Sequence, residues 1–261
     1  MSKERTLAVK IRFLGAGYHG FQRQQNALTI QEVIEAALLK ILGQPTTIFG
    51  CSRTDTGVSA YEYVFSFKTS NLITTEKLKG ALNHFLPDDI AVLDAAEAGE
   101  NFHARYDTKE KEYEYIVRNT RQKDPFCEGR VCRYGITRLN ENLLNRAAVH
   151  FVGKHDFSAF CSADDGAVSH VRTITRASVE RRGDDVIFTF RADGFLYNMV
   201  RIMVGTLLFV NQGKIDENDI PKIIESRERK NAGMTAEAQG LYLKKVIYKS
   251  DPFNKREETN G

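Results

Sequence analysis

The sequence predicts an α+β fold in which antiparallel sheets carry helices on one side. Several short segments alternate hydrophobic and polar residues with period two, which is typical of strands, and others repeat hydrophobic residues at helical spacing. Both halves of the chain place these segments in the same rough order, which hints at a pseudo-repeat, although no residue identity supports it. With 261 residues, 42% of them hydrophobic, the chain is long enough for one large domain or two modest ones.

In the first half, alternation over residues 7–13 predicts a strand. A helix follows, because Thr29-Ile30-Gln31-Glu32 fits a capping box and Gly43 is a suitable helix end. The remaining elements expected in this half are strands at 46–49, 61–68 and 90–93, and a helix at 78–85 that stops before Pro87.

In the second half, residues 111–118 alternate and predict a strand, and a long polar connection at 119–137 follows it. Its arginines and lysine either contact an anionic partner or are simply solvated. The other expected elements are helices at 139–151, 198–208 and 215–229 and a last strand after Gly240. A strand that starts at 171–174 and another at 186–190 are expected to form a hairpin with its turn at 183–185.

Composition excludes several classes of protein. No apolar run approaches the ~20 residues of a membrane helix, and the polar segment Met1–Thr6 is unlike a signal peptide, so we expect a cytoplasmic protein. The four cysteines form no C-x-x-C pair and have no zinc-like spacing to histidine, so reduced, partly buried thiols are expected. A net charge of +3 permits an anionic partner without requiring one.

The loop 51–58, between two predicted strands, is the first candidate site. In an extended segment Arg53 and Asp55 point to the same side, so the guanidinium can favour the ionised carboxylate and orient it. An oriented carboxylate suits nucleophilic or proton-transfer chemistry. Gly57 permits the chain to turn past Asp55. The alternative is that Asp and Gly only make a turn.

A glycine-containing loop at 15–20 forms a second candidate. The spacing fits G-x-G-x-x-G, but the following residues do not start an apolar helix, so a dinucleotide site is discounted. Gln22, Arg23 and Gln24 instead supply planar donors and acceptors suited to phosphates, sugars and base edges. A solvated loop is the alternative.

Two further residues stand out in the second half. Arg201 is the only charge in an apolar helix, so we expect a carboxylate partner, with Asp55 as the candidate; otherwise its stem reaches solvent. Tyr113 shares a strand face with Tyr115 and either packs on the sheet or stacks on a nucleic-acid base.

Several motifs together resemble the tRNA pseudouridine synthases of the TruA family. These are Arg-Thr-Asp-x-Gly-Val at 53–58, the segment 20–24, Phe-His-Ala-Arg-Tyr at 102–106, and Gly-x-His-Asp-Phe-x-x-Phe at 153–160. The resemblance extends from Gly20 to Leu243. This chain departs from the family pattern at four positions. It has Ser52 where the family has Gly, Thr56 where it has Ala or Ser, Ser59 where it has His, and Phe21 where it has Trp.

The resemblance implies a pseudouridine synthase fold with two subdomains around a central cleft, and a homodimer. We place the subdomains at 1–108 and 109–261, and expect the tail 249–261 to be disordered. The implied activity is isomerisation of uridine to pseudouridine at positions 38 to 40 of the tRNA anticodon arm. This reaction requires neither a metal nor a cofactor.

The resemblance also implies roles for individual residues. Asp55 would be the catalytic residue, as nucleophile or as base at the sugar, with Arg53 and Arg201 keeping it ionised and aimed. Tyr113 and Leu241 would hold the extruded base. The remaining expected contacts come from Gln22, Arg23 and Gln24 to RNA, and from Arg105 to phosphate or to the subdomain join.

Two alternatives to this activity are open. One is an RNA-binding module of related fold in which Asp55 only makes a turn. The other, an oligosaccharide-processing enzyme with paired carboxylates, is weaker because no second carboxylate occurs in a comparable motif.

Overall fold

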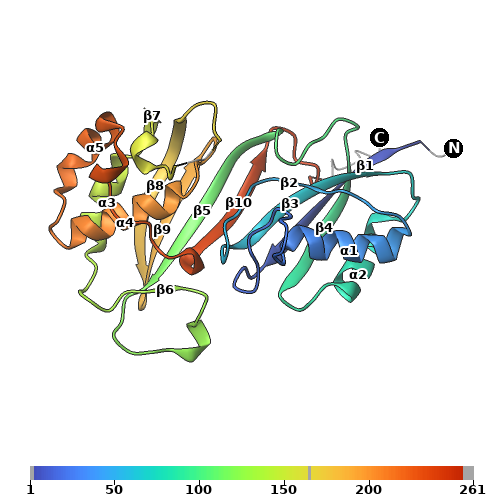
Figure 1. The fold of residues 1–261 in the computed structure, drawn as a ribbon, viewed down its shortest axis with the longest axis horizontal. Helices are drawn as coiled ribbons and strands as arrows, with labels where there is room; N and C mark the ends of the chain where they lie inside the picture. The colour runs from blue at the N-terminus through green and yellow to red at the C-terminus, as the bar shows by residue number, and fades with distance from the viewer. Residues whose placement is uncertain (1–2, 164–165, 255–261) are drawn as a thin grey trace, which may run out of the picture. The chain divides into compact units, whose positions relative to one another are not determined.

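The computed structural model describes residues 3–163 and 166–254. Contacts divide the chain into two compact units. Unit 1 contains the residues up to Lys109 together with the segment from Lys244 on, and unit 2 is Glu110–Leu243. Each unit contains antiparallel strands and helices, as the ribbon shows (Figure 1), and all ten strands belong to one sheet.

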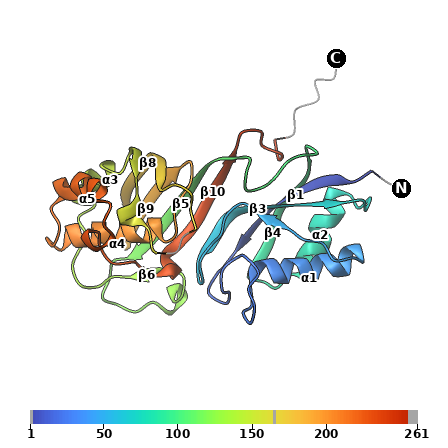
Figure 2. The ribbon, with the colours of Figure 1, turned by 45° about the horizontal axis from the view of Figure 1, so that its top comes forward.

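Unit 1 has a sheet in which β1 lies between β3 and β4 and is antiparallel to both. Val9 of β1 is opposite Phe65 on one side and Ala95 on the other. Helices α1 and α2 lie side by side against this sheet (Figures 1 and 2). The elements are β1 (Arg5–Phe13), α1 (Ile30–Leu42), β2 (Phe49–Gly50), β3 (Ser59–Thr69), α2 (Thr75–Phe85) and β4 (Ile90–Ala98).

The predicted signals explain these elements. Thr29 accepts a hydrogen bond from the N–H of Glu32 and so caps α1, which ends at Gly43. In β3 the alternating aromatic residues Tyr63, Phe65 and Phe67 are buried. Burial of each such side chain contributes about 1.5–3 kcal/mol, which makes β3 the centre of the unit 1 core.

Unit 2 has the strand order β5-β9-β8-β7, all antiparallel, and a short β6 that pairs with β5 in parallel. A two-residue turn at Gly183-Asp184 joins β8 to β9, as predicted. The elements are β5 (Thr108–Arg118), β6 (Cys132–Arg133), α3 (Glu141–Val149), β7 (Gly153–Asp156), β8 (Val171–Arg182), β9 (Asp185–Ala192), α4 (Met199–Asn211) and α5 (Ile220–Ser226).

The predicted α+β class is confirmed, and several elements differ in extent. The strand expected at 46–49 is reduced to Phe49–Gly50. The connection 119–137 is not irregular throughout, because it contains a 3₁₀ turn at Pro125–Cys127 and the strand β6. The helix expected at 215–229 is only α5 between 3₁₀ turns, because Pro221 stands at its start and Arg227 ends it in the left-handed region.

The last strand is β10 (Leu241–Tyr248), and the boundary between the two units falls within it and not only at the predicted position. The prediction assigned all of 109–261 to the second subdomain, whereas the part from Lys244 on groups with unit 1. Its contacts explain this: Lys244 Nζ lies 4.8 Å from the ring centroid of Tyr61, and the Tyr248 hydroxyl donates to the carbonyl of Ala104.

The segment expected to be a disordered tail is described in part. Asn254 N–H donates to the carbonyl of Asp251, and Lys10 Nζ lies 4.6 Å from the ring centroid of Phe253. These contacts order the chain through residue 254. Residues 255–261 lie outside the described residues.

Three sequence expectations concern sulfur, metal and membrane. All four cysteines are free thiols, as predicted. In the described ranges, no three side chains of His, Cys, Asp or Glu gather as metal ligands would. Within the same ranges, no helix has the length and hydropathy needed to cross a bilayer.

Candidate active site

Asp55 lies at the first position of a tight turn that follows β2. Its carbonyl accepts a hydrogen bond from the N–H of Val58 at 3.1 Å. Gly57, at the third position, has a φ of +81°, a conformation that favours glycine. The predicted need for glycine here is confirmed, and the turn leaves the side chain of Asp55 half-buried.

The loop 15–20 fixes this turn from outside the sheet. Gly57 N–H donates to the carbonyl of Tyr18 at 3.2 Å, and Gly15 N–H donates to the hydroxyl of Ser59 at 2.9 Å. The approach is close enough that a Cβ on Gly15 would lie 2.1 Å from the Val58 carbonyl oxygen. The glycines of this loop therefore let it pack closely against the Asp55 turn.

An aromatic pair contacts the segment that leads into the turn. The Tyr63 hydroxyl donates to the carbonyl of Ser52, and the rings of Phe21 and Tyr63 are stacked with centroids 4.2 Å apart. Phe21 is 2% exposed. The aromatic residue before Gln22 is therefore a core residue, and Ser52 is held through its backbone.

Arg53 is exposed, whereas Asp55 is half-buried. The expected pairing of these two side chains is not present among the described residues. The intervening Thr54 is buried, and its hydroxyl is the buried side-chain polar atom that has no hydrogen-bond partner in the part of the chain described. Thr54 is buried between two less buried residues, which is the order that alternation gives, and the placing of Arg53 and Asp55 in one cavity stays a prediction.

Gln22, Arg23 and Gln24 are all exposed, as RNA contacts need to be. Arg23 pairs with Glu35 of α1 at 2.6 Å, and Gln24 Nε2 donates to the carbonyl of His19 at 2.9 Å. These contacts hold two of the three side chains in place on the surface of unit 1.

Arg105 is exposed on a turn at 102–106. Its guanidinium carbon lies 5.9 Å from the ring centroid of Tyr106, which is 72% exposed. The neighbouring His103 accepts a hydrogen bond from Arg105 N–H, and its ring lies tilted against that of Phe49 with centroids 5.1 Å apart. These contacts make His103 a structural residue of this turn.

In unit 2, Arg201 lies in the first turn of α4 and is half-buried. Its Nε donates to the carbonyl of Ala236 at 2.7 Å, and its Nη1 donates to Oδ1 of Asn198 at 2.7 Å. Both bonds fix the plane of the guanidinium within unit 2. The expected ion pair with Asp55 stays a prediction, because the two residues belong to different units.

Tyr113 and Leu241, the residues expected to hold the base, are each 6% exposed. The Tyr113 ring packs edge-on against Phe195, with centroids 5.0 Å apart. Both belong to unit 2, as Arg201 does, whereas Arg53 and Asp55 belong to unit 1. Their meeting in one site is therefore also a prediction.

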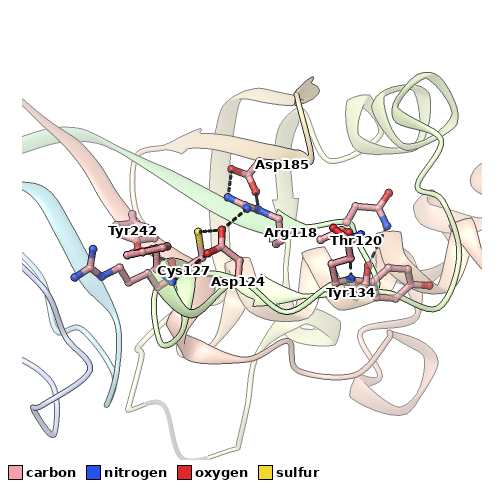
Figure 3. Close-up of polar contacts among 11 residues, drawn as sticks. Arg118, Thr120, Asp124, Cys127, Tyr134, Asp185 and Tyr242 are labelled. Carbon is pink, nitrogen blue, oxygen red and sulfur yellow. Dashed lines mark hydrogen bonds and ion pairs between the residues drawn. The ribbon is translucent and has the colours of Figure 1, made fainter.

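A polar pocket of about 200 Å³ lies in unit 2, and its lining residues Glu237 and Gln239 precede Leu241 closely in the chain. Its wall includes a cluster drawn in Figure 3, in which Arg118 donates from Nη1 to Asp124 at 3.0 Å and also pairs with Asp185. The Cys127 thiol donates to the carboxylate of Asp124 at 3.2 Å. The pocket is lined by Arg118, Gln122, Asp124, Cys127, Glu128, Val131, Arg133, Glu237 and Gln239.

The charges of this cluster stabilise one another. The hydrogen bond from Cys127 and then the Phe126 N–H hold the pKa of Asp124 below its usual range. The same bond to Asp124 raises the pKa of the Cys127 thiol, and the bond to Asp185 raises the pKa of Arg118. The cluster therefore ties the connection 119–137 to the sheet, and its thiol is not activated.

Comparison with known proteins adds to this geometry. The family model described as tRNA pseudouridine synthase matches residues 9–107 and 147–249. A tRNA pseudouridine synthase A of Acetivibrio thermocellus is 45% identical over 245 residues, covering 94% of this chain and 100% of that protein. One from Thermoanaerobacter sp. (strain X514) is 43% identical over 244 residues, with the same coverage.

The chain belongs to the tRNA pseudouridine synthase family. The matched segments of the family include Arg53 and Asp55 in the first and Arg201 and Leu241 in the second, whereas Tyr113 lies between them. Among solved structures, a chain of a Cbf5-Nop10-Gar1 complex aligns with a TM-score of 0.39 and 12% identity, covering 92% of this chain and 50% of that one. A likeness at that level adds nothing to the family assignment.

Sequence reasoning missed three residues beside the expected site of this synthase-family chain. Ser59 anchors the loop 15–20, Thr54 buries an unpaired hydroxyl, and Asn198 binds Arg201. Ser59 was noted only as a departure from the family motif. Asn198 precedes a helix, which predicts a helix cap and not a contact with an arginine.

Proposed function

We propose that this protein isomerises uridine to pseudouridine at positions 38 to 40 of the anticodon arm of tRNA, with Asp55 as the catalytic residue. Membership of the tRNA pseudouridine synthase family over nearly the whole chain carries the proposal. Such an enzyme is an isomerase. The half-buried carboxylate of Asp55, on a turn fixed by its hydrogen bonds and by Gly57, supplies the reactive group.

The reaction breaks the N1–C1′ bond of uridine, turns the base while it is bound, and joins C5 to C1′. C5 loses its hydrogen and N1 gains one, so substrate and product are isomers. Asp55 acts at the sugar, either as nucleophile or as base. The uridine has to leave its stack first, which costs a few kcal/mol and least in a loop or at a helix end.

Tyr113 and Leu241 are assigned to the extruded base, with the tyrosine ring as a stacking platform. Arg201 is assigned to Asp55, because a fixed guanidinium beside a carboxylate favours its ionised form. Arg53 is assigned to an RNA phosphate and not to Asp55, since it is exposed and forms no ion pair with that carboxylate in the described residues. These roles require both units to contribute to one central cleft.

The exposed polar residues are assigned to the RNA backbone. Gln22, Arg23 and Gln24 present amide and guanidinium groups on one loop, and Arg105 lies beside the exposed ring of Tyr106. A basic group next to an aromatic ring is a common nucleic-acid contact. We further propose that the enzyme is a homodimer and acts in the cytoplasm, where its substrate tRNA is found.

The test is Asp55→Asn, assayed with tRNA labelled with tritium at C5 of uridine, because isomerisation releases that hydrogen. We expect no detectable release, while affinity for tRNA stays within a few fold because the variant keeps the shape of the side chain. Asp88→Asn is the matched control, since Asp88 is an exposed aspartate of the same unit. It should retain full activity.

Two results would contradict the proposal. Wild-type turnover by Asp55→Asn would remove Asp55 from the chemistry. Binding of tRNA by the wild type without any tritium release would favour an RNA-binding module without catalysis. Mapping pseudouridine in tRNA from cells with and without the protein tests the positions.

A further inference from the structure

Asn198, the residue before α4, has an unusual conformation. Its φ is +60° and ψ is 7°, in the left-handed region, which a non-glycine residue seldom adopts. Asparagine before a helix normally takes an extended conformation and accepts a hydrogen bond from an N–H of the first turn. Asn198 makes no such side-chain bond to α4. Asn198 is therefore a residue of a type that often caps helices, but its side chain does not cap α4.

The amide group of Asn198 is used elsewhere. Oδ1 accepts from Nη1 of Arg201 at 2.7 Å, and Nδ2 donates to the hydroxyl of Ser162 at 2.9 Å. Because a guanidinium only donates, the amide oxygen has to face Arg201, and the NH₂ then faces Ser162. Ser162 is itself held by a bond from its N–H to the carbonyl of Tyr197 at 3.2 Å.

Arg201 is thereby held at two nitrogens. Nη1 is bound to Asn198, and Nε is bound to the carbonyl of Ala236 at 2.7 Å. Two bonds from different nitrogens of a planar group fix both its position and the direction of its plane. An unconstrained arginine would instead sample several rotamers.

We propose that Asn198 is a positioning residue that aims the Arg201 guanidinium at the reacting carboxylate. This rests on the proposed function, in which Arg201 binds Asp55. The left-handed backbone is what turns the amide away from the helix and toward Nη1, and strained backbone of this kind is retained where function requires it.

The choice of amide over carboxylate follows from charge. The amide oxygen accepts a hydrogen bond but carries no charge, so it orients the guanidinium without neutralising it. An aspartate at position 198 would compete with Asp55 for the same cation. Asn198 thus leaves the positive charge of Arg201 to act on the catalytic carboxylate.

Asn198→Gly is the decisive variant, because glycine keeps the left-handed backbone and removes only the amide. We expect kcat to fall about tenfold to a hundredfold through misorientation, while KM for tRNA stays within about twofold. The acid limb of the profile of kcat/KM against pH should move to higher pH, because a loosened Arg201 stabilises the ionised Asp55 less. Asn198→Asp should show both changes.

Arg227→Gly is the matched control. Arg227 is another non-glycine residue of unit 2 with positive φ, at 55°, so the variant makes the same backbone change away from the site. It should keep the wild-type kcat and pH profile. Ser162→Ala removes only the partner of Nδ2 and should give a smaller fall in kcat in the same direction as Asn198→Gly.

Wild-type kcat and an unshifted pH profile in a folded Asn198→Gly protein would overturn the inference. If that variant fails to fold, Ser162→Ala decides, and an unchanged kcat and profile there would overturn it equally. The proposed function fails separately: activity in Asp55→Asn refutes that function, whereas an inactive Asp55→Asn with a fully active Asn198→Gly refutes only the role of Asn198.

Discussion

At the residue scale, Thr54 is the buried hydroxyl without a partner in the described part of the chain. A buried polar group in that state costs about 1–3 kcal/mol. Valine has the same shape without the hydroxyl. We therefore expect the free energy of unfolding of Thr54→Val to be unchanged or up to about 1 kcal/mol higher, as measured by urea denaturation.

Thr206 provides the matched comparison, because it is a fully buried threonine whose hydroxyl is paired. It donates to the carbonyl of Ile202 and accepts from Gly233 N–H, both at 2.8 Å. Thr206→Val should lose about 1–3 kcal/mol. An equal loss in Thr54→Val would show that the Thr54 hydroxyl has a partner after all.

Single residues differ in how far the sequence predicts them. Gly57 was predictable, because the turn needs a positive φ after the carboxylate. The burial of Phe21 was not, since its ring is covered by Tyr63 from a strand about 40 residues away in the chain. Asn198 was predicted only as part of a helix start, because the local pattern does not show that its amide bonds to Arg201 and to Ser162, 36 residues away.

At the element scale, the loop 15–20 and the Asp55 turn pack against each other so closely that each fixes the position of the other. A Cβ on Gly15 would lie 2.1 Å from the Val58 carbonyl oxygen, which is backbone and cannot swing aside. Gly15→Ala should therefore displace the turn, lower the free energy of unfolding by about 1–3 kcal/mol, and abolish most tritium release from labelled tRNA.

Gly17→Ala is the control within the same loop. The nearest atom to its Cβ would be Asp89 Oδ2, at 4.0 Å, so the change should alter stability by less than about 0.5 kcal/mol and leave activity intact. Normal activity and stability in Gly15→Ala would mean that the loop does not hold the Asp55 turn.

The extents of elements were predictable where a local signal ends them. Thr29 and Gly43 bound α1 as expected, because both caps are made by residues at the ends themselves. The segment 215–229 was misjudged, because its apolar spacing continues past Pro221 while the backbone does not. The structure of the connection 119–137 was not predictable from local pattern. Arg118, which pairs with Asp124 in this connection, also pairs with Asp185, which is distant in the chain.

At the scale of the whole molecule, the α+β class followed from alternation and helical spacing, but the division of β10 did not. Residues on either side of Lys244 have the same strand-like pattern, and the pattern does not say which unit each part joins. Long-range pairing decides that, and it is the part of a fold that local sequence specifies least.

Both units contain a buried tyrosine that makes stability depend on alkaline pH. The Tyr115 hydroxyl of unit 2 donates to the carbonyl of Glu237 at 2.7 Å, and the Tyr248 hydroxyl of unit 1 donates to the carbonyl of Ala104 at 2.8 Å. Burial is the main cause that raises the pKa of each phenol far above its ordinary value of 10.0.

The direction of the effect follows from which state keeps the proton. Below about pH 10 both the folded and unfolded chains hold these phenolic protons, so the contribution to stability is complete there. Above about pH 10 the unfolded chain releases protons that the folded chain retains, which favours unfolding. We expect each tyrosine to lower the free energy of unfolding by up to about 1.4 kcal/mol per pH unit in that range.

Urea denaturation at intervals from pH 8 to 11 measures the slope. Tyr115→Phe and Tyr248→Phe should each lose a hydrogen bond, worth about 0.5–1.5 kcal/mol at pH 8, and should each reduce the alkaline slope by about one proton. Comparing each variant with the wild type removes the contributions of lysines and thiols. A slope that neither substitution changes would mean that these phenols ionise in the folded protein as readily as in the unfolded chain.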